Sequence, residues 1–250
     1  MSKVMTNTAF VEKLKDIANN YKTLYVMGCF GAPMNATNKA RYRNNNDYNR
    51  QPARQAMIDK ATADTFGFDC VCLIKGVLWG WNGNQNAVYG GATYASNGVP
   101  DIGANSMINV CSGVTTDFSK VEVGEAVWKE GHIGVYIGDG LAVECTPAWK
   151  NKVQITAVAN MGSKSGYNSR TWTKHGKLPY IEYVKQNEDN TGVPFKDVDK
   201  NAYYYKAVKW AVENGITAGT SSDTFSPNEP CTRAQMVQFL YRFYQRFIQK

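Results

Sequence analysis

The chain has 250 residues, enough for one large domain or for one domain with a small module. Apolar residues make up 43% of it and charged residues 20%, which is typical of a globular protein, and no run of about eighteen apolar residues could form a membrane span. The net charge of +7 favours polyanionic partners, either nucleic acid or a cell wall rich in phosphate and carboxylate groups.

The N-terminal residues differ from a secretory signal, because charged side chains interrupt the apolar run that such a signal needs. These are Glu12, Lys13, Lys15 and Asp16. We therefore expect no signal peptide and synthesis in the cytoplasm. The six cysteines show no CxxC pair and no regular spacing, so we expect reduced thiols, most of them buried. With two histidines and no ligand spacing, we expect neither a metal site nor a cofactor.

The first predicted element is a helix, because residues 10–21 carry apolar side chains at helical spacing, with Thr8 as the cap. Residues 24–27 form an extended segment. Residues 33–55 are rich in Asn and Arg and carry few apolar side chains. So long a polar stretch predicts either a functional loop or a mobile, solvated one.

The middle of the chain predicts an α+β fold. A second apolar helix covers about 70–79, a loop rich in Gly and Asn runs to about residue 100, and a short helix lies near 102–111. The strand-like segments that follow are 125–129, 132–137, 141–145, 153–156 and 178–184. One buried helix followed by a run of antiparallel strands is an α+β pattern, unlike the alternation of a parallel sheet.

The last sixty residues have a different character. The segment 186–190 (QNEDN) has no apolar residue and is typical of a linker. An amphipathic stripe over 204–212 then ends at an Asn-Gly pair, and a last helix opens at Thr232 with a capping box. We therefore expect a first domain at 1–187 and a small all-α module at 191–250.

Cys70 is the candidate nucleophile. Asp69 is a good N-cap, which places Cys70 in the first helical turn, where unpaired N–H groups and the positive end of the helix dipole favour a thiolate. Cys70 shares a helix face with Leu73, Ile74 and Val77, so it should point toward the sheet. A cysteine in an apolar helix is more often an inert core residue, and the capped position is the reason to depart from that interpretation.

His132 is the candidate base. On a strand, His132, Gly134 and Tyr136 share one face, and Gly134 clears space beside the imidazole. A strand histidine taken alone is more often structural, so the prediction depends on its pairing with Cys70.

Glu144 is the candidate orienting group, and the register of the hairpin decides whether it can serve. A two-residue turn would put Glu144 on the face away from His132. A three-residue loop, Gly138-Asp139-Gly140, would pair Ile137 with Leu141 and bring Glu144 within reach of the imidazole. We predict the three-residue loop; the alternative is an exposed edge glutamate.

Together these residues form a set of nucleophile, base and orienting group. We expect a Cys70 thiolate, paired with a His132 imidazolium, to attack an amide carbonyl while the Cys70 N–H helps to hold the oxyanion. His132 then protonates the leaving amine and activates the water that resolves the acyl-enzyme.

Several segments in this order resemble a known family. Phe68–Ile74 (FDCVCLI), followed about sixty residues later by Gly131–Gly140 (GHIGVYIGDG), resembles NlpC-type cell-wall cysteine peptidases. Tyr25–Gly28 is similar to the tyrosine segment that precedes the nucleophile in that family, and Gly124–Val127 looks like the strand that leads to the histidine. The resemblance spans about residues 8–184.

The resemblance implies a papain-like fold and hydrolysis of amide bonds in peptidoglycan stem peptides, commonly next to D-glutamate. It gives Tyr25 and Asp69 a part in substrate binding. Cys72 stands where a glycine is usual, Glu144 replaces a commoner histidine or other polar group, and residues 33–55 look like an insertion, which leaves the substrate preference open. Without a leader, the layout is similar to that of a phage-encoded lysin that reaches the wall through a separate membrane pore.

The C-terminal residues resemble one S-layer homology repeat. The segments that carry this likeness are 195–198 (FKDV), 210–216 (WAVENGI), 224–227 (TFSP) and 232–235 (TRAQ). Such repeats are helical and bind anionic wall polymers, and the resemblance points to Arg233 as a contact; alternatively Arg233 only decorates an exposed helix start. These modules usually act in threes, so a single repeat should bind weakly unless chains associate into a homo-oligomer.

Three other functions stay open. The same fold could serve an N-acetylmuramoyl-L-alanine amidase, which cleaves between glycan and peptide. The chain could also be a non-catalytic wall-binding protein with a decayed peptidase domain. Nucleic-acid binding through the Arg-rich segment 39–54 has charge but few interleaved aromatic residues and no recognised motif, so we expect no nucleic-acid partner.

Overall fold

The computed structural model describes residues 3–184 and 193–249, and the chain divides into two compact units, residues 1–184 and 185–250. The linker expected at 186–190 lies outside the described residues.

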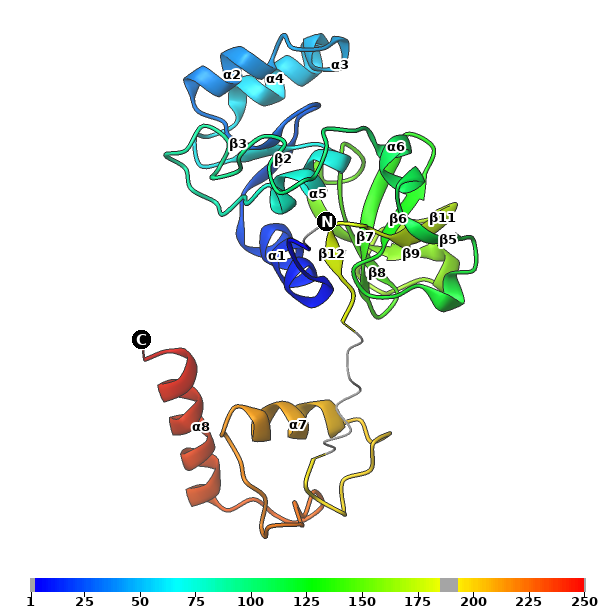
Figure 1. Ribbon diagram of the computed structural model, residues 1–250. Coiled ribbons are helices and arrows are strands. Elements are labelled where there is room, and N and C mark those ends of the chain that lie inside the picture. Colours follow the sequence, from blue (N-terminus) through cyan, green and yellow to red (C-terminus); the bar gives the residue numbers. More distant parts are fainter. Residues whose placement is uncertain (1–2, 185–192, 250) are drawn as a thin grey trace. The chain divides into compact units, whose positions relative to one another are not determined.

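A seven-stranded sheet forms the centre of the first unit (Figure 1). Its strand order is β10-β9-β8-β7-β6-β11-β5, and every neighbouring pair except β10 and β9 runs antiparallel. The strands are β5 (Ser112–Thr115), β6 (Ala126–Lys129), β7 (His132–Gly138), β8 (Leu141–Thr146), β9 (Lys152–Val158), β10 (Ser169–Arg170) and β11 (Lys174–Lys177). The unit is mixed α+β, as the sequence predicts.

The strand assignments after residue 170 need correction. The segment expected at 178–184 contains only the short β12 (Ile181–Glu182), which pairs in parallel with β1 (Met5–Thr6). The neighbouring β11 was missed, because its sequence KHGK has no apolar side chain to give an alternating pattern. Backbone pairing with β6 and β5 on its two sides makes it a strand.

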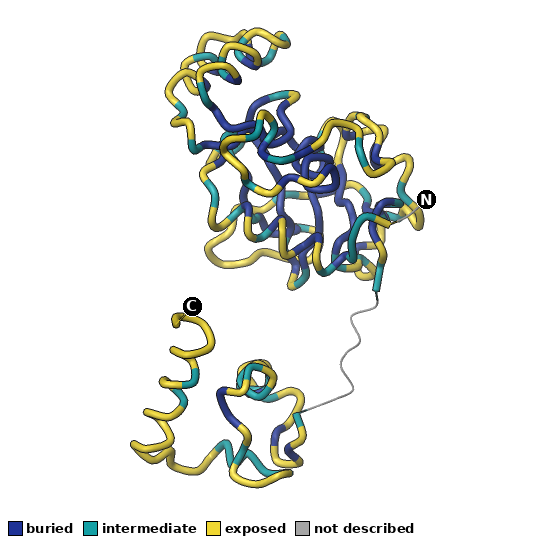
Figure 2. The backbone as a smooth tube through the Cα atoms, turned by 60° about the vertical axis from the view of Figure 1, so that its left-hand side comes forward, coloured by how far each residue is buried: buried dark blue, intermediate teal, exposed yellow. Residues whose placement is uncertain are grey.

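The helix α5 (Cys70–Leu78) lies at the heart of the first unit. Every residue of α5 is buried, and the helix packs on β7 and β8 (Figures 1 and 2). It follows β4 (Phe66–Phe68), the middle strand of a small sheet with β2 (Thr23–Tyr25) and β3 (Phe30–Pro33). The apolar helix predicted at 70–79 is therefore confirmed.

The remaining regular elements of the first unit are short, apart from the first helix. The helix α1 (Asn7–Asn20) begins after Thr6, whose hydroxyl accepts a hydrogen bond from the Ala9 N–H; the predicted cap Thr8 lies inside the first turn instead. The helix predicted near 102–111 is α6 (Ala104–Asn109). Two 3-10 turns follow, η1 (Phe118–Lys120) and η2 (Ala159–Met161).

Residues 33–55 are not the loop that the sequence predicts. They fold mainly into α2 (Ala36–Tyr42), α3 (Asp47–Arg50) and the start of α4 (Pro52–Lys60), which lie together at one side of the unit (Figure 1). Asparagine side chains cap α2 and α3, since Asn35 and Asn46 each accept from the N–H three residues ahead. Capped helices this short show no apolar period, which is why pattern reading missed them.

The second unit has its own small core of Phe195, Val198 and Val208. Its helices are α7 (Tyr205–Glu213) and α8 (Arg233–Phe247), and the predicted capping box of Thr232 and Gln235 is present. The segment that joins α7 to α8 has no regular structure, so the module expected to be all-α is helical only in part among the described residues. Most of α8 is exposed (Figure 2). Among the described residues, no helix is long and apolar enough to cross a membrane.

Candidate active site

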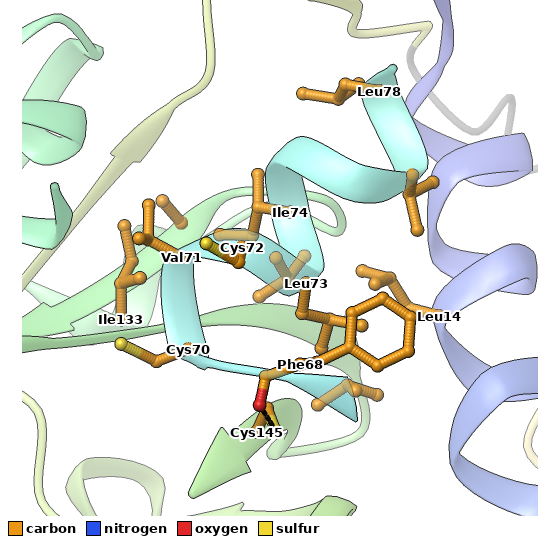
Figure 3. Close-up of a cluster of buried hydrophobic side chains, with 14 of the residues drawn as sticks. Leu14, Phe68, Cys70, Val71, Cys72, Leu73, Ile74, Leu78, Ile133 and Cys145 are labelled. Carbon is orange, nitrogen blue, oxygen red and sulfur yellow. Dashed lines mark hydrogen bonds between the residues drawn. The ribbon is translucent and has the colours of Figure 1, made fainter. Parts of the chain in front are cut away.

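Cys70 is the first residue of α5, and Asp69 fixes the start of that helix. The Asp69 carboxylate accepts hydrogen bonds from the Cys72 N–H and the Gly28 N–H, both at 2.7 Å. It therefore joins α5 to the turn that follows β2. Figure 3 shows the Cys70 sulfur projecting beside Ile133 of β7. The predicted N-cap is confirmed, and the predicted direction toward the sheet is confirmed with it.

The predicted thiolate is not supported by the surroundings of the sulfur. Burial raises the pKa of Cys70 to about 12, and the Asp69 carboxylate raises it further, while the backbone groups of Ile133, Val71 and Cys70 itself lower it. Desolvation of the charged form outweighs the favourable helix start. The resting sulfur is therefore a neutral thiol.

His132 and Glu144 form a close pair. The His132 Nε2 lies 2.6 Å from a Glu144 carboxylate oxygen. Because an ionised carboxylate only accepts hydrogen bonds, Nε2 carries the proton and Nδ1 is the nitrogen left to act on Cys70. No hydrogen bond joins Cys70 to His132, both of which the structure describes. The backbone of Ile133, the next residue after His132, meets the sulfur instead.

The hairpin reaches the predicted arrangement by a different route. Gly138 pairs with Leu141, so the turn has two residues, Asp139 and Gly140, both at positive φ; the three-residue loop was wrong. A β-bulge at Ile137 then shifts the pairing by one residue, so that Tyr136 pairs with Ala142. This bulge puts Glu144 on the His132 face, as predicted.

The Glu144 side chain is fully buried, and its carboxylate has four hydrogen-bonding contacts, one of them with His132. Thr156 donates to one oxygen at 2.7 Å, and the Arg170 Nε lies 2.9 and 2.7 Å from the two oxygens. Burial alone would raise the pKa of Glu144, but the hydrogen bonds from His132 and Arg170 outweigh it and hold that pKa below its ordinary value. Glu144 is thus an anion held in one orientation.

Two aromatic residues complete the surroundings of His132. The Trp172 ring stacks on the imidazole at 5.5 Å between centroids, and the Arg170 guanidinium lies over Trp149 and Trp172. Gly134 gives the room, since a Cβ there would lie 3.1 Å from Trp172. Sequence reasoning missed Arg170, Trp172 and Thr156; Thr156 follows from the pairing of β8 with β9, but nothing in the pattern of residues 159–173 marks the other two.

A cavity of about 400 Å³ opens beside Cys70, and Tyr25 and Asp69 both line it. A residue from the segment that was expected to be a loop, Arg54, holds Tyr25 in place. The buried Arg54 donates to the Tyr25 carbonyl oxygen and, at 2.8 Å, to the Asn151 side chain, while its guanidinium lies 5.6 Å from the Tyr25 ring centroid. The helices at 33–60 therefore support one wall of the cavity.

The second histidine lies in a separate cluster. His175 pairs with Glu125 through Nδ1, and Nε2 lies 3.0 Å from the Asp117 carbonyl oxygen. All six cysteines are free, and no group of three or more His, Cys, Asp or Glu side chains among the described residues could hold a metal ion.

The site residue predicted in the second unit, Arg233, is the exposed first residue of α8. A family model described as the S-layer homology domain matches residues 194–237. The surface-layer 125 kDa protein of Lysinibacillus sphaericus is 46% identical to this chain over 48 residues, which is 19% of this chain and 4% of that protein. The chain therefore carries an S-layer homology domain at residues 194–237.

Proposed function

We propose that the first unit is a papain-like cysteine peptidase that hydrolyses amide bonds in the stem peptides of peptidoglycan, and that the S-layer homology domain holds it on the wall. The observation that supports this most is the ordered pair of His132 on β7 and Glu144 on β8, the two strands on which α5 packs, together with the cavity that Cys70 borders.

The neutral thiol gives His132 the role of general base from the first step. His132 Nδ1 takes the Cys70 proton as the sulfur attacks the carbonyl carbon of the substrate amide. The oxyanion that forms accepts from the Cys70 N–H, which lies in the first turn of α5, where N–H groups have no acceptor within the helix.

The intermediate then collapses in the usual order. The imidazolium of His132 gives its proton to the leaving amine, the C–N bond breaks, and a thioester to Cys70 remains. His132 next takes a proton from water, the hydroxide attacks the thioester carbonyl, and the sulfur leaves and regains its proton. The Glu144 anion stabilises the imidazolium at each stage without taking its proton.

The proposed location follows from the second unit. An S-layer homology domain suggests binding to cell-wall polymers, so we place the working protein at the bacterial wall. The chain spans 4% of the surface-layer relative, so that protein's role as a whole is not carried over.

Product analysis of purified wall tests the proposal. The native chain should release peptides with new termini inside the stem, and Cys70→Ala should release none, while Cys111→Ala serves as a matched control at another free cysteine. An amidase would instead free an intact L-alanine terminus from the glycan. Equal digestion by the native and Cys70→Ala chains, or none by either, would reject the peptidase.

A further inference from the structure

The loop between β8 and β9 presents a tryptophan that the proposed reaction does not use. Trp149 is 47% exposed, and its backbone has a left-handed φ of 55°. A bulky side chain rarely takes that conformation, and residues held in it occur often where a protein binds a ligand. The indole N–H of Trp149 has no hydrogen-bond acceptor among the described residues, so it can donate to a ligand.

Hydrogen bonds at both ends hold this loop in place. The Ala148 N–H donates to the Thr146 hydroxyl at 3.3 Å, and the buried Gln154 amide donates to the Ala148 carbonyl oxygen at 3.1 Å. At the other end, the Asn151 side chain accepts from Arg54 at 2.8 Å. A surface that is fixed before a ligand arrives loses little conformational entropy on binding, so the loop is suited to recognition.

Arg170 connects the Trp149 ring to the candidate active site. Its guanidinium lies 4.8 Å from the ring centroid of Trp149, and its Nε lies 2.7 Å from a carboxylate oxygen of Glu144. Glu144 is in turn the partner of His132. A ligand on the exposed part of the Trp149 ring would therefore have two side chains, Arg170 and Glu144, between it and the imidazole.

The residues that follow Trp149 line a polar cavity of about 360 Å³ at the edge of β9. This cavity shares no lining residue with the one beside Cys70. Lys150 and Lys152 give it two positive charges, and no described Asp or Glu side chain lines it. The last turn of α1 also borders the cavity, but a helix end carries only about half a negative charge. The balance of charge therefore favours an anionic ligand.

The neutral groups of the cavity suit a sugar better than a bare anion. Asn19 and Asn168 bring side-chain amides and Tyr167 brings a hydroxyl, and such groups can donate to and accept from the hydroxyls of a ligand. The electron-rich face of an indole attracts the C–H groups of a sugar ring. A nucleic acid could also stack on Trp149, but binding its backbone takes a longer row of cations than two lysines.

We propose that Trp149 and the cavity at Lys150 and Lys152 form a subsite for an acidic saccharide. A sugar ring packs on the indole, and a carboxylate or phosphate group of the same saccharide lies against the two ammonium groups. This assignment goes beyond the proposed peptidase function and does not depend on it.

Calorimetry with short saccharides tests the subsite in the full chain. Every chain carries Arg233→Ala, which weakens the proposed wall contact of the second unit. The probes are trigalacturonate and a maltotriose phosphate, each with its uncharged counterpart, carboxyl-reduced trigalacturonate and maltotriose. At least one acidic trisaccharide should have a Kd about tenfold or more below that of its neutral counterpart. The acid that binds more tightly identifies the group that the lysines contact.

Substitutions in the two parts of the subsite should have different effects. Lys150→Gln with Lys152→Gln should abolish the preference for the acidic form. Lys13→Gln with Lys60→Gln removes two exposed lysines that lie outside the cavity and should keep the preference. Trp149→Asn should raise the Kd of the acidic form about tenfold, because Asn removes the ring and still tolerates the left-handed backbone. Trp149→Phe should recover part of the affinity.

Hydrogen exchange followed by mass spectrometry locates the bound saccharide. Exchange should slow at residues 146–155 and 166–170. Slowing confined to residues 193–249, native affinity in Trp149→Asn, equal affinity for acidic and neutral forms, or no saturable binding would each overturn the subsite. Tighter binding of hexathymidylate than of either acidic trisaccharide would assign the surface to nucleic acid instead. None of these measurements needs cleavage, so a failure of the proposed peptidase and a failure of the subsite are distinguishable.

Discussion

Glu144 is the residue on which the geometry of the candidate site depends most. It is fully buried, it receives hydrogen bonds from His132, Thr156 and Arg170, and it is the only carboxylate that contacts His132 among the described residues. A buried anion is stable only with such partners, and each partner is in turn fixed by it. The orientation of the imidazole is thus a product of the whole network.

Glu144→Gln should lower kcat by about 10²- to 10⁴-fold, because the amide no longer stabilises the imidazolium of His132. It should also lower the free energy of unfolding at pH 7 by about 1–3 kcal/mol, since Arg170 loses its anionic partner. Single-turnover kinetics and urea unfolding measure the two effects. Glu182→Gln, at an exposed position of β12, is the control. Full activity in Glu144→Gln would remove Glu144 from the site.

The stability of the fold should depend on pH through the ionisation of Glu144. The pKa of Glu144 in the folded chain lies below its ordinary value of 4.5, so its ionised form stabilises the fold above about pH 4.5. That contribution is lost as the pH falls through the lowered pKa. Between neutral pH and pH 3 the native chain should therefore lose more stability than Glu144→Gln, and parallel unfolding curves for the two chains would contradict this.

The protonation state of Cys70 gives a second prediction at this scale. Because burial raises its pKa to about 12, alkylation by iodoacetamide should be slow at pH 7 and should rise with pH without a plateau below about pH 10. Peptide mapping by mass spectrometry follows each cysteine, with the exposed Cys231 as an internal reference. A plateau below pH 8 would show the thiolate–imidazolium pair that the sequence predicted.

Sequence reasoning reached those site residues that lie in elements with a recognisable sequence pattern. Asp69 and Cys70 stand at a recognisable helix start, and the alternation of β7 marks the face of His132. Arg170 and Trp172 could not be found this way, because they lie in a segment without a periodic pattern. Their proximity to Glu144 and His132 is set by the tertiary fold.

The hairpin of β7 and β8 shows how an element can reach a predicted outcome by an unpredicted path. Two neighbouring glycines at 138 and 140 suit more than one turn, since each has a positive φ in the structure. Turn chemistry alone therefore could not choose between two and three loop residues. The bulge at Ile137 sets the register, and no local sequence feature predicts a bulge there.

Gly134→Ala tests whether this hairpin is as closely packed as its geometry indicates. A Cβ at this position would lie 2.9 Å from the Val143 carbonyl oxygen and 3.3 Å from the Glu144 Cβ, so β8 or Trp172 must shift. We expect a loss of about 1–3 kcal/mol in the free energy of unfolding. The kcat of the folded fraction should fall as well, because both partners of His132 are displaced. Urea unfolding and kinetics at saturating substrate measure the two effects. An unchanged free energy of unfolding together with an unchanged kcat would contradict the prediction.

The helices at 33–60 are a larger element whose structure the local sequence could not predict. Asn49 is fully buried and bonds to the backbone of Met27 and Tyr42, so a side chain typical of loops organises a packed segment. Composition predicted a loop, either functional or solvated, because it counts polar residues without knowing their partners. The structure turns the segment into a support for Tyr25, through Arg54.

At the scale of the whole molecule, the two units have separate hydrophobic cores. The clusters around α5 and the sheet draw only on the first unit, and the cluster of Phe195, Val198 and Val208 only on the second. Cooperative unfolding of each unit should then be independent of the other. Catalysis and wall attachment should likewise respond to different substitutions.

The exposed apolar residues of α8 predict association between chains. They are Met236, Val237, Leu240, Tyr241, Phe243, Tyr244 and Phe247, and the C-cap Ile248 is exposed as well. Light scattering should give a mass that rises above the 27.8 kDa of one chain as the concentration increases. Leu240→Gln should weaken this rise, and a mass that stays at one chain for both proteins at every concentration would contradict it.

Arg233→Ala provides the sharpest separation of the two proposed roles. Arg233 is exposed at the start of α8, so its removal should leave the fold intact while weakening retention on purified wall about tenfold, through loss of one contact to an anionic polymer. Hydrolysis of a soluble stem peptide should be unchanged, because that reaction needs only the first unit. Cys70→Ala should show the reverse, with full retention and no hydrolysis. Arg246→Ala, at an exposed position in the last turn of the same helix, controls for loss of charge alone. Equal retention of the Arg233→Ala and Arg246→Ala chains would show that general charge, and not a contact at the start of α8, attaches the protein to the wall.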